Sequence, residues 1–177
     1  MDQDLSYEDR PLPIGCGQTI SQPYVVAYMT EVLRLPERAH VLEVGTGSAY
    51  QAAVLAEIAE QVFSVGIVPE LVIRAAELLG RLGYRNVETA GGDGSDGWPE
   101  KAPYDGILVT AAADRVPEAL LDWLKPGARL VMPVGPQWQQ NLVVVTRTGA
   151  GWRKESVMSV CFVPMTGRVR QVELRDE

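Results

Sequence analysis

The sequence predicts an α/β fold, in which a mostly parallel, doubly wound sheet carries helices on both faces and ends in an antiparallel hairpin. Two observations lead to this prediction. Short apolar runs alternate with segments of helical periodicity between residues 40 and 134. Beyond them, two strand-like runs follow each other with no helical segment between them. Alternation favours parallel strands joined by right-handed crossovers, whereas adjacent strand-like runs favour a hairpin.

The first half of the alternation contains three predicted strands and two predicted helices. The strands are the short apolar runs 40–44, 61–65 and 86–90. Segment 50–60 has apolar residues at helical spacing, and segment 69–83 begins with proline and ends at glycine, as helices commonly do. These elements make two strand–helix–strand units.

The second half continues the pattern and then changes it. Strands are predicted at 104–110 and 128–134, on either side of a short helix at 116–125 that should stop at the Pro-Gly that follows it. The runs 141–148 and 152–165 are separated only by Gly-Ala-Gly, which indicates the hairpin and inserts one antiparallel strand into the sheet.

The composition predicts one domain that spans residues 1–177. A chain of 177 residues, 46% of them hydrophobic, can bury a sizeable core. No apolar run approaches the roughly 20 residues that cross a membrane, and the acidic N-terminus has no apolar signal-peptide core. Two cysteines make no disulfide framework, so we expect a cytoplasmic protein. A net charge of −7 disfavours a nucleic-acid partner, because neutralising phosphates requires clustered Lys and Arg.

Ligands of doubly wound sheets bind in the loops at the carboxyl ends of the strands. Those loops are expected to begin at Gly45, Gly66, Gly91 and Thr110. In the first of them, Gly45 and Gly47 permit a tight turn and a close approach of backbone N–H groups to a ligand. The spacing Gly-x-Gly-x-Ala does not meet the dinucleotide fingerprint, so a tight turn without a ligand remains the alternative.

Two further loops bear on nucleoside binding. The acidic residue that holds ribose hydroxyls is expected about 20 residues after the first glycine, where this chain has Gly66. Glu70 follows, but it is explained more simply as an acid in the first turn of a helix. Asp93 lies between glycines just past a strand, where it could reach a purine edge or could form an ordinary Asp-Gly turn.

The segment "LPIGCGQTISQPY" precedes a predicted helix, for which Ser21 is the expected cap and Pro23 a first-turn residue. The hydroxyls of Thr19 and Ser21 at this helix N-terminus could bind an anion, or they could serve as ordinary caps. His40 is the only histidine and begins a strand, where a structural role is expected. No Ser–His–Asp set and no metal-ligand cluster is evident, so no metal site is expected.

Six segments together resemble the protein-L-isoaspartate (D-aspartate) O-methyltransferase family. The resemblance runs from about Leu12 to Gly167 and includes "LPIGCGQTISQPY", "VLEVGTGSAYQ", "GGDGSDGWPEKAPYD", "ILVTAAA", "LKPGARLVMPVG" and "FVPMTG". It implies a Rossmann-like methyltransferase fold and methyl transfer from S-adenosylmethionine to the free carboxylate of L-isoaspartyl or D-aspartyl residues in damaged proteins, which initiates their repair. The implied product is S-adenosylhomocysteine, the implied partners are isoaspartyl-containing peptides and proteins, and a monomer is expected.

The resemblance also implies roles for particular residues. It places Thr19 and Ser21 at the substrate carboxylate as catalytic residues, and it places the substrate cleft at Ile20, Phe162 and Val163. The implied cofactor-binding residues are Glu43, Gly45, Gly47, Ser48, Gly66, Asp93 and Gly94, with Asp93 and Gly94 beside the adenine. An ionised carboxylate needs no general base, and methyl transfer needs mainly in-line placement.

Three positions depart from the family pattern. Bacterial members usually have histidine where Cys16 stands, glycine where Ala49 stands and a ribose-binding acid where Gly66 stands. Losing charge-assisted hydrogen bonds to the ribose costs roughly 1.5–3 kcal/mol, and a methyl group at Ala49 is expected to add a steric cost. The alternative is therefore a weakened or silent relative that keeps the fold but binds cofactor poorly. Restoring glutamate at Gly66 is expected to tighten cofactor binding.

Overall fold

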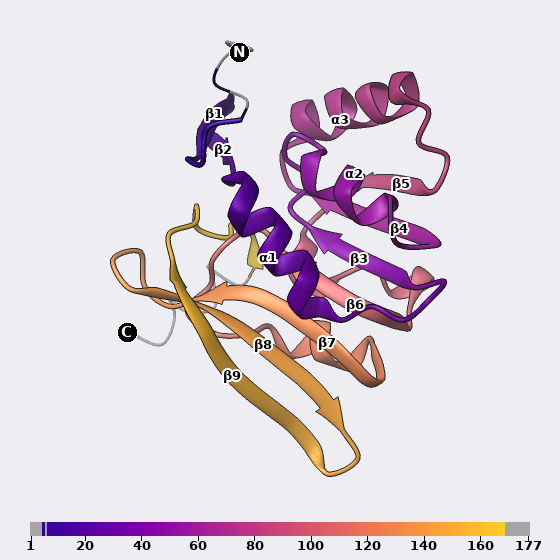
Figure 1. Ribbon diagram of the computed structural model, residues 1–177, viewed down its shortest axis with the longest axis vertical. Coiled ribbons are helices and arrows are strands. Elements are labelled where there is room, and N and C mark those ends of the chain that lie inside the picture. The colour runs from indigo at the N-terminus through magenta and orange to yellow at the C-terminus, as the bar shows by residue number, and fades with distance from the viewer. Residues whose placement is uncertain (1–4, 6, 169–177) are drawn as a thin grey trace.

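The computed structural model of the protein describes residues 5 and 7–168 (Figure 1). Seven strands form one sheet in the order β5-β4-β3-β6-β7-β8-β9. The sheet is parallel from β5 to β7, and β8 lies antiparallel between β7 and β9. The doubly wound fold with its terminal hairpin is thus confirmed. The strands are β3 (His40–Val44), β4 (Gln61–Gly66), β5 (Val87–Gly91), β6 (Tyr104–Val109), β7 (Leu124–Val134), β8 (Gln140–Thr148) and β9 (Gly151–Val160).

A second, two-stranded sheet precedes these elements and was not predicted from the sequence. It is a hairpin of β1 (Leu12–Gly15) and β2 (Gln18–Ile20). The helices are α1 (Pro23–Leu33), α2 (Tyr50–Ala56), α3 (Pro69–Leu82) and α4 (Glu118–Asp122), with short 3₁₀ turns η2 (Gly94–Asp96) and η3 (Pro99–Lys101). Within residues 5 and 7–168, no helix has the length and apolar character needed to cross a membrane.

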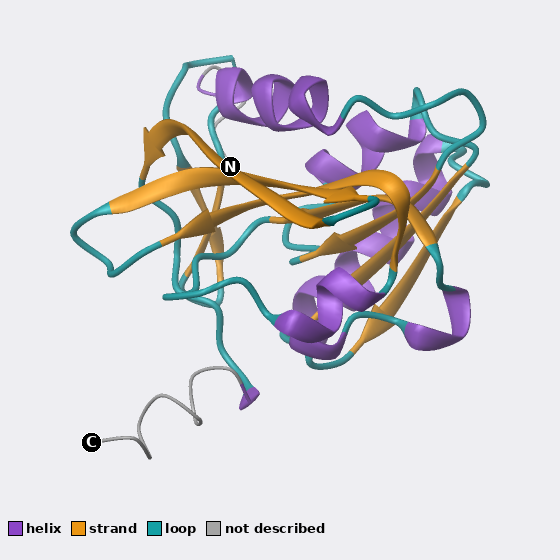
Figure 2. Ribbon diagram, turned by 90° about the horizontal axis from the view of Figure 1, so that it is seen from below, coloured by secondary structure: helices purple, strands orange, loops and turns teal. Residues whose placement is uncertain are grey.

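Each face of the large sheet has its own hydrophobic core, because alternate strand residues point to opposite faces. Helices lie on both sides of the strands (Figure 2). On one face, α1 and α2 pack over a core that contains Met29, Leu55 and Val41. On the other face, α4 packs over a core that contains Leu42 and Tyr104. Side chains of β3 at odd positions therefore lie beneath α1 and α2, shielded from water.

Several boundaries differ from the sequence prediction, and β9 ends at Val160, five residues before the predicted end at Met165. α2 ends at Ala56, four residues early. α4 ends at Asp122, and β7 already begins at Leu124. The Pro-Gly that was expected to stop the helix lies instead inside β7, where the pairing with β6 is irregular and tolerates proline. The N-cap of α1 is Gln22 and not Ser21, and its side chain makes no capping hydrogen bond.

The segment that follows β9 is held against the carboxyl end of β6. The Ala112 N–H donates to the Val163 carbonyl at 2.9 Å, and the Met165 N–H donates to the Ala112 carbonyl at 2.6 Å. The buried Gln140 side chain adds a two-point clamp on Phe162. Its Nε2 donates to the Phe162 carbonyl at 3.1 Å, and its Oε1 accepts from the Phe162 N–H at 2.6 Å. Phe162 and Val163 are thereby fixed beside the ends of the central strands.

We predict that Gln140→Met lowers the free energy of unfolding by about 2 kcal/mol, since the Phe162 N–H and carbonyl are left buried without partners. Urea denaturation measures the change. Gln139→Met is the matched control, because the Gln139 side chain is exposed. A Gln140→Met variant as stable as this control would show that the clamp does not hold the segment.

Candidate functional site

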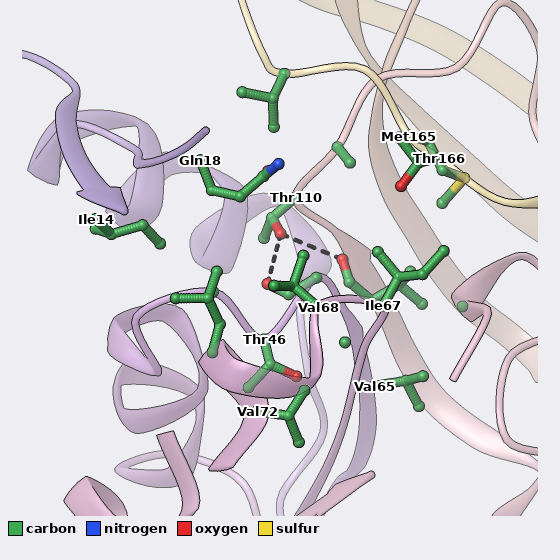
Figure 3. Close-up of a pocket in the computed structure, with 18 of the residues that line it drawn as sticks. Ile14, Gln18, Thr46, Val65, Ile67, Val68, Val72, Thr110, Met165 and Thr166 are labelled. Carbon is green, nitrogen blue, oxygen red and sulfur yellow. Dashed lines mark hydrogen bonds between the residues drawn. The ribbon is translucent and has the colours of Figure 1, made fainter. Parts of the chain in front are cut away.

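Three adjoining cavities lie at the carboxyl ends of the central strands. What we call the β3–β4 cavity is shown in Figure 3 and is lined by Ile14, Gln18, Thr19, Val44–Gly47, Val65–Val68, Leu71, Val72, Gly94, Thr110, Ala111 and Val163–Thr166. The α1 cavity is lined by Pro11, Thr19, Ser21, Gln22, Tyr24, Val25, Thr110 and Met158–Val163. The Glu43 cavity is lined by Thr19, Ile20, Ser21, Val26, Glu43, Gly45–Ser48, Tyr50, Gln51 and Thr110. Thr19 and Thr110 line all three.

The cavities meet where Thr110 approaches the backbone of Gly45. The Thr110 Oγ1 donates to the Gly45 carbonyl at 2.8 Å and to the Val44 carbonyl at 3.2 Å, as the dashed lines in Figure 3 mark. A Cβ atom on Gly45 would lie 2.1 Å from that oxygen, so only glycine permits the contact. Gly45 also has φ of +109°, which disfavours other residues. Gly45 thus allows Thr110 to link the ends of β3 and β6, and it leaves its own backbone facing the cavity.

Among the described residues, Glu43 is the one fully buried carboxylate of the site. It is 0% exposed beneath α1 and α2. Its Oε2 accepts from the Ser64 Oγ at 2.5 Å, while its Oε1 has no partner among the described residues. Burial raises the pKa of Glu43 to about 8, although the Ser64 hydrogen bond works in the opposite direction. The carboxyl group is therefore mostly neutral at pH 7 in the free protein.

The hydroxyls of Thr19 and Ser21 are available to a ligand. Neither makes a hydrogen bond to another residue in the part of the chain that the structure describes, so the interpretation as simple helix caps does not hold. The neighbouring first turn of α1 already attracts a carboxylate, because the Tyr24 N–H donates to Asp9 Oδ1 at 3.2 Å. Asp9 thus occupies one backbone donor at this helix end, and the hydroxyls of Thr19 and Ser21 remain as donors at the α1 cavity.

Of the three departures from the family pattern, only Gly66 lines a cavity. Ala49 has a left-handed backbone, with φ of +69°, and its side chain packs with Ala75 and Leu79 under α3. Its cost is therefore backbone strain of about 1 kcal/mol, and the expected steric conflict with a cofactor is not supported. Cys16 lies exposed at the tip of the β1–β2 hairpin, with its Sγ 3.6 Å from Glu70 Oε2.

The space in front of Gly66 is filled by its neighbours. A Cβ atom there would lie 2.6 Å from Val72 Cγ2 and 3.0 Å from Thr46 Oγ1. A glutamate side chain at position 66 therefore has no room unless these neighbours move. The expectation that it would simply tighten cofactor binding does not take this into account. None of the residues that line the β3–β4 cavity, as far as the structure describes them, carries a charge.

Asp93 lies next to the β3–β4 cavity but does not line it, whereas Gly94 does. The Asp93 carboxylate accepts from the Ser95 N–H at 3.0 Å, the Ser95 Oγ at 2.8 Å and the Arg168 N–H at 2.7 Å. Burial alone would raise the pKa of Asp93, but these hydrogen bonds outweigh it and the pKa is lowered. The carboxylate thus caps η2 and holds the segment after β9.

The cavity linings include all but one of the residues assigned by resemblance. Asp93 is the exception, and Gly45, Gly47, Gly66, Ser48, Ile20, Phe162 and Val163 all line at least one cavity. Sequence reasoning identified the loop at Thr110 but did not name that residue as part of the site. It also missed Gln18 and Val72, which give no chemical signal in the sequence. No group of three or more potential metal ligands occurs among the described residues.

We predict that Glu43→Gln gains stability relative to the parent as the pH rises. The folded parent keeps a proton that the unfolded chain releases above the ordinary carboxyl pKa of 4.5, so the parent loses stability up to its folded pKa of about 8. The difference between the two proteins should grow by about 1.4 kcal/mol per pH unit within this window. Urea denaturation from about pH 5 to pH 8 measures it, and a constant difference would contradict a neutral Glu43.

Comparisons with known proteins identify the family. The sequence model of protein-L-isoaspartate(D-aspartate) O-methyltransferase matches residues 2–170. A curated protein-L-isoaspartate O-methyltransferase of Gloeobacter violaceus is 55% identical over 163 residues, which cover 92% of this chain and 80% of the relative. That of Myxococcus xanthus is 56% identical over 173 residues, which cover 94% of this chain and 82% of the relative.

Solved structures agree. A protein-L-isoaspartate O-methyltransferase with 30% identity superposes with a TM-score of 0.88; the match covers 96% of this chain and 56%, just over half, of that longer chain. A Plasmodium falciparum protein described as a putative protein-L-isoaspartate O-methyltransferase, determined with S-adenosyl-L-homocysteine, gives 27% identity and a TM-score of 0.82 over 94% of this chain and 84% of its own. The chain therefore belongs to the protein-L-isoaspartate (D-aspartate) O-methyltransferase family.

Proposed function

We propose that this chain transfers the methyl group of S-adenosylmethionine to the free carboxylate of L-isoaspartyl or D-aspartyl residues in damaged proteins, and so initiates their repair. The observation that carries the proposal is the convergence of the β3–β4, Glu43 and α1 cavities at Thr19 and Thr110. The β3–β4 cavity suits a nucleoside, the Glu43 cavity suits an ammonium group, and the α1 cavity suits a carboxylate. Membership of the family supplies the reaction that unites these three groups.

The residues of the β3–β4 cavity and the Glu43 cavity fit S-adenosylmethionine in most respects. Val65, Val68 and Val72 offer an apolar wall to a base. Gly45 and Gly47 expose backbone at the turn, and Glu43 Oε1 is a buried oxygen without a partner among the described residues. When bound, S-adenosylmethionine supplies a methyl group on a sulfonium, which an ionised carboxylate accepts without any proton transfer. Only the ribose lacks the expected carboxylate, because Gly66 has no side chain.

The substrate side is assigned to the α1 cavity. The hydroxyls of Thr19 and Ser21 donate to the isoaspartyl carboxylate and orient it toward the junction of the cavities. Phe162 and Val163, which Gln140 and Ala112 hold in place, border the peptide. Proximity and alignment therefore account for the rate enhancement that these side chains provide. Neither hydroxyl acts as an acid or a base.

One observation favours the alternative of a weakened or silent relative. The β3–β4 cavity has no charged side chain among its described lining residues, so the ribose hydroxyls find no ionic acceptor there. Methylation of an isoaspartyl peptide at saturating S-adenosylmethionine separates the two functions. Transfer of a labelled methyl group to the isoaspartyl peptide and not to the matched aspartyl peptide supports the enzyme, and no transfer supports the silent relative.

We further propose that the chain acts as a single domain and a monomer in the cytoplasm. The free, exposed thiols of Cys16 and Cys161 support a reducing compartment. The net charge of −7 supports a protein partner over nucleic acid.

We predict that Ser21→Ala lowers kcat/KM for an isoaspartyl peptide about tenfold or more, because one hydrogen bond to a charged group is lost. The pH profile near neutrality should not move, since a hydroxyl does not titrate there. Ser156→Ala is the control, because Ser156 is exposed on β9 and lines none of the three cavities. Equal kcat/KM values for Ser21→Ala and the control would remove Ser21 from the site.

We predict that Gly66→Glu alone lowers the free energy of unfolding by about 1–3 kcal/mol through overpacking against Val72 and Thr46. Adding Val72→Ala makes room for the new side chain. The double variant should then bind S-adenosylhomocysteine about tenfold more tightly than Val72→Ala alone, because a carboxylate can accept from the ribose hydroxyls. Calorimetric titration compares the proteins. A fully stable Gly66→Glu protein with tightened binding would show that Val72 is no obstacle.

A further inference from the structure

Glu43 combines three properties that a purely structural carboxylate rarely combines. It is completely buried, one of its oxygens has no hydrogen-bond partner in the described structure, and it lines a cavity open to a ligand. A buried polar atom without a partner lowers stability, because it loses its hydrogen bonds to water and gains none in the protein. Such a cost is retained more readily where a ligand supplies the missing partner.

No charged side chain compensates Glu43 from the elements packed around it. On the adjacent strands, Ser64 of β4 and Leu108 of β6 pair with it in register. From the helices and the first hairpin, the neighbours that line its cavity are uncharged, and they include Val26, Gln51 and Thr19. Tyr50 is the one other titratable residue in that lining among the described residues, and it is 41% exposed. Within residues 5 and 7–168, the lining of this cavity therefore supplies no positive charge to Glu43.

We infer that Glu43 selects a ligand bearing a cationic ammonium group, and that it exchanges its own proton for that cation when the ligand binds. The inference rests on the proposed function, which identifies the ammonium as that of S-adenosylmethionine or S-adenosylhomocysteine. It adds the protonation change and a consequence for specificity.

The exchange balances in atoms and charge. In the free protein, the O–H bond of Glu43 is intact and the group is neutral, as expected for a carboxyl group out of contact with water. On binding, this O–H bond breaks and its electron pair stays on the carboxylate. The proton passes to the solvent, and the carboxylate accepts an N–H hydrogen bond from the ammonium. One buried charge is thereby paired with another, so neither remains uncompensated.

The experiment is calorimetric titration of the full chain with S-adenosylhomocysteine in buffers of different ionisation enthalpy. Near pH 6.5 the parent should release close to one proton per ligand, and near pH 8 about half a proton. Its affinity should fall about tenfold for each pH unit below neutrality. Glu43→Gln should release no proton and should show an affinity independent of pH across this range. 5′-Methylthioadenosine, which keeps the nucleoside and lacks the amino-acid part, should release none from either protein.

The possible results separate this inference from the proposed function. If the parent binds S-adenosylhomocysteine without releasing a proton, or if Glu43→Gln still releases one, the exchange at Glu43 is wrong while the cofactor assignment stands. If the parent binds no S-adenosylhomocysteine, both are overturned. Should Glu43→Gln fail to fold, infrared difference spectra of the parent give the answer. The stretching band of a protonated carboxyl must disappear when S-adenosylhomocysteine binds, and a persistent band contradicts the exchange.

Discussion

The contact between Thr110 and the backbone of Gly45 is the constraint on which the site depends. β3 lies between β4 and β6 in the sheet. Thr110 joins the ends of β3 and β6 through two hydrogen bonds, and only a glycine at position 45 leaves room for them. All three cavities open at this junction. A cofactor and a substrate that occupy neighbouring cavities are therefore brought together by the fold.

The site combines low charge with one buried acid. Residues around the β3–β4 cavity are uncharged where described, and Glu43 is held in a neutral form by burial. Such a site costs stability at neutral pH, and we infer that a positively charged ligand offsets this cost. The substrate carboxylate needs only orientation, because it is ionised already. The absence of a general base from the assigned residues is consistent with this chemistry.

The sequence alone was sufficient for the sheet, and the residues that the family resemblance assigned to the site, apart from Asp93, line the cavities at the strand ends. Apolar runs located β3 to β7, since buried parallel strands leave a strong pattern, and two strand-like runs separated only by Gly-Ala-Gly located the β8–β9 hairpin. The β1–β2 hairpin was missed because strands of three and four residues carry too little pattern. The start of β7 was missed because a Pro-Gly pair usually ends a helix, whereas here Pro126 lies inside the strand. The approach of Thr46 to Gly66 and the hydrogen bond from Arg168 to Asp93 depend on contacts between segments that are distant in the sequence. A single sequence does not contain that information.

A crystal structure with S-adenosylhomocysteine and an isoaspartyl peptide would show how the three cavities are filled. We expect the nucleoside against Val65 and Val72, the ammonium beside Glu43, and the isoaspartyl carboxylate at Thr19 and Ser21, facing the sulfur across the junction at Thr110. A nucleoside outside the β3–β4 cavity, or a carboxylate bound away from Thr19 and Ser21, would contradict this arrangement.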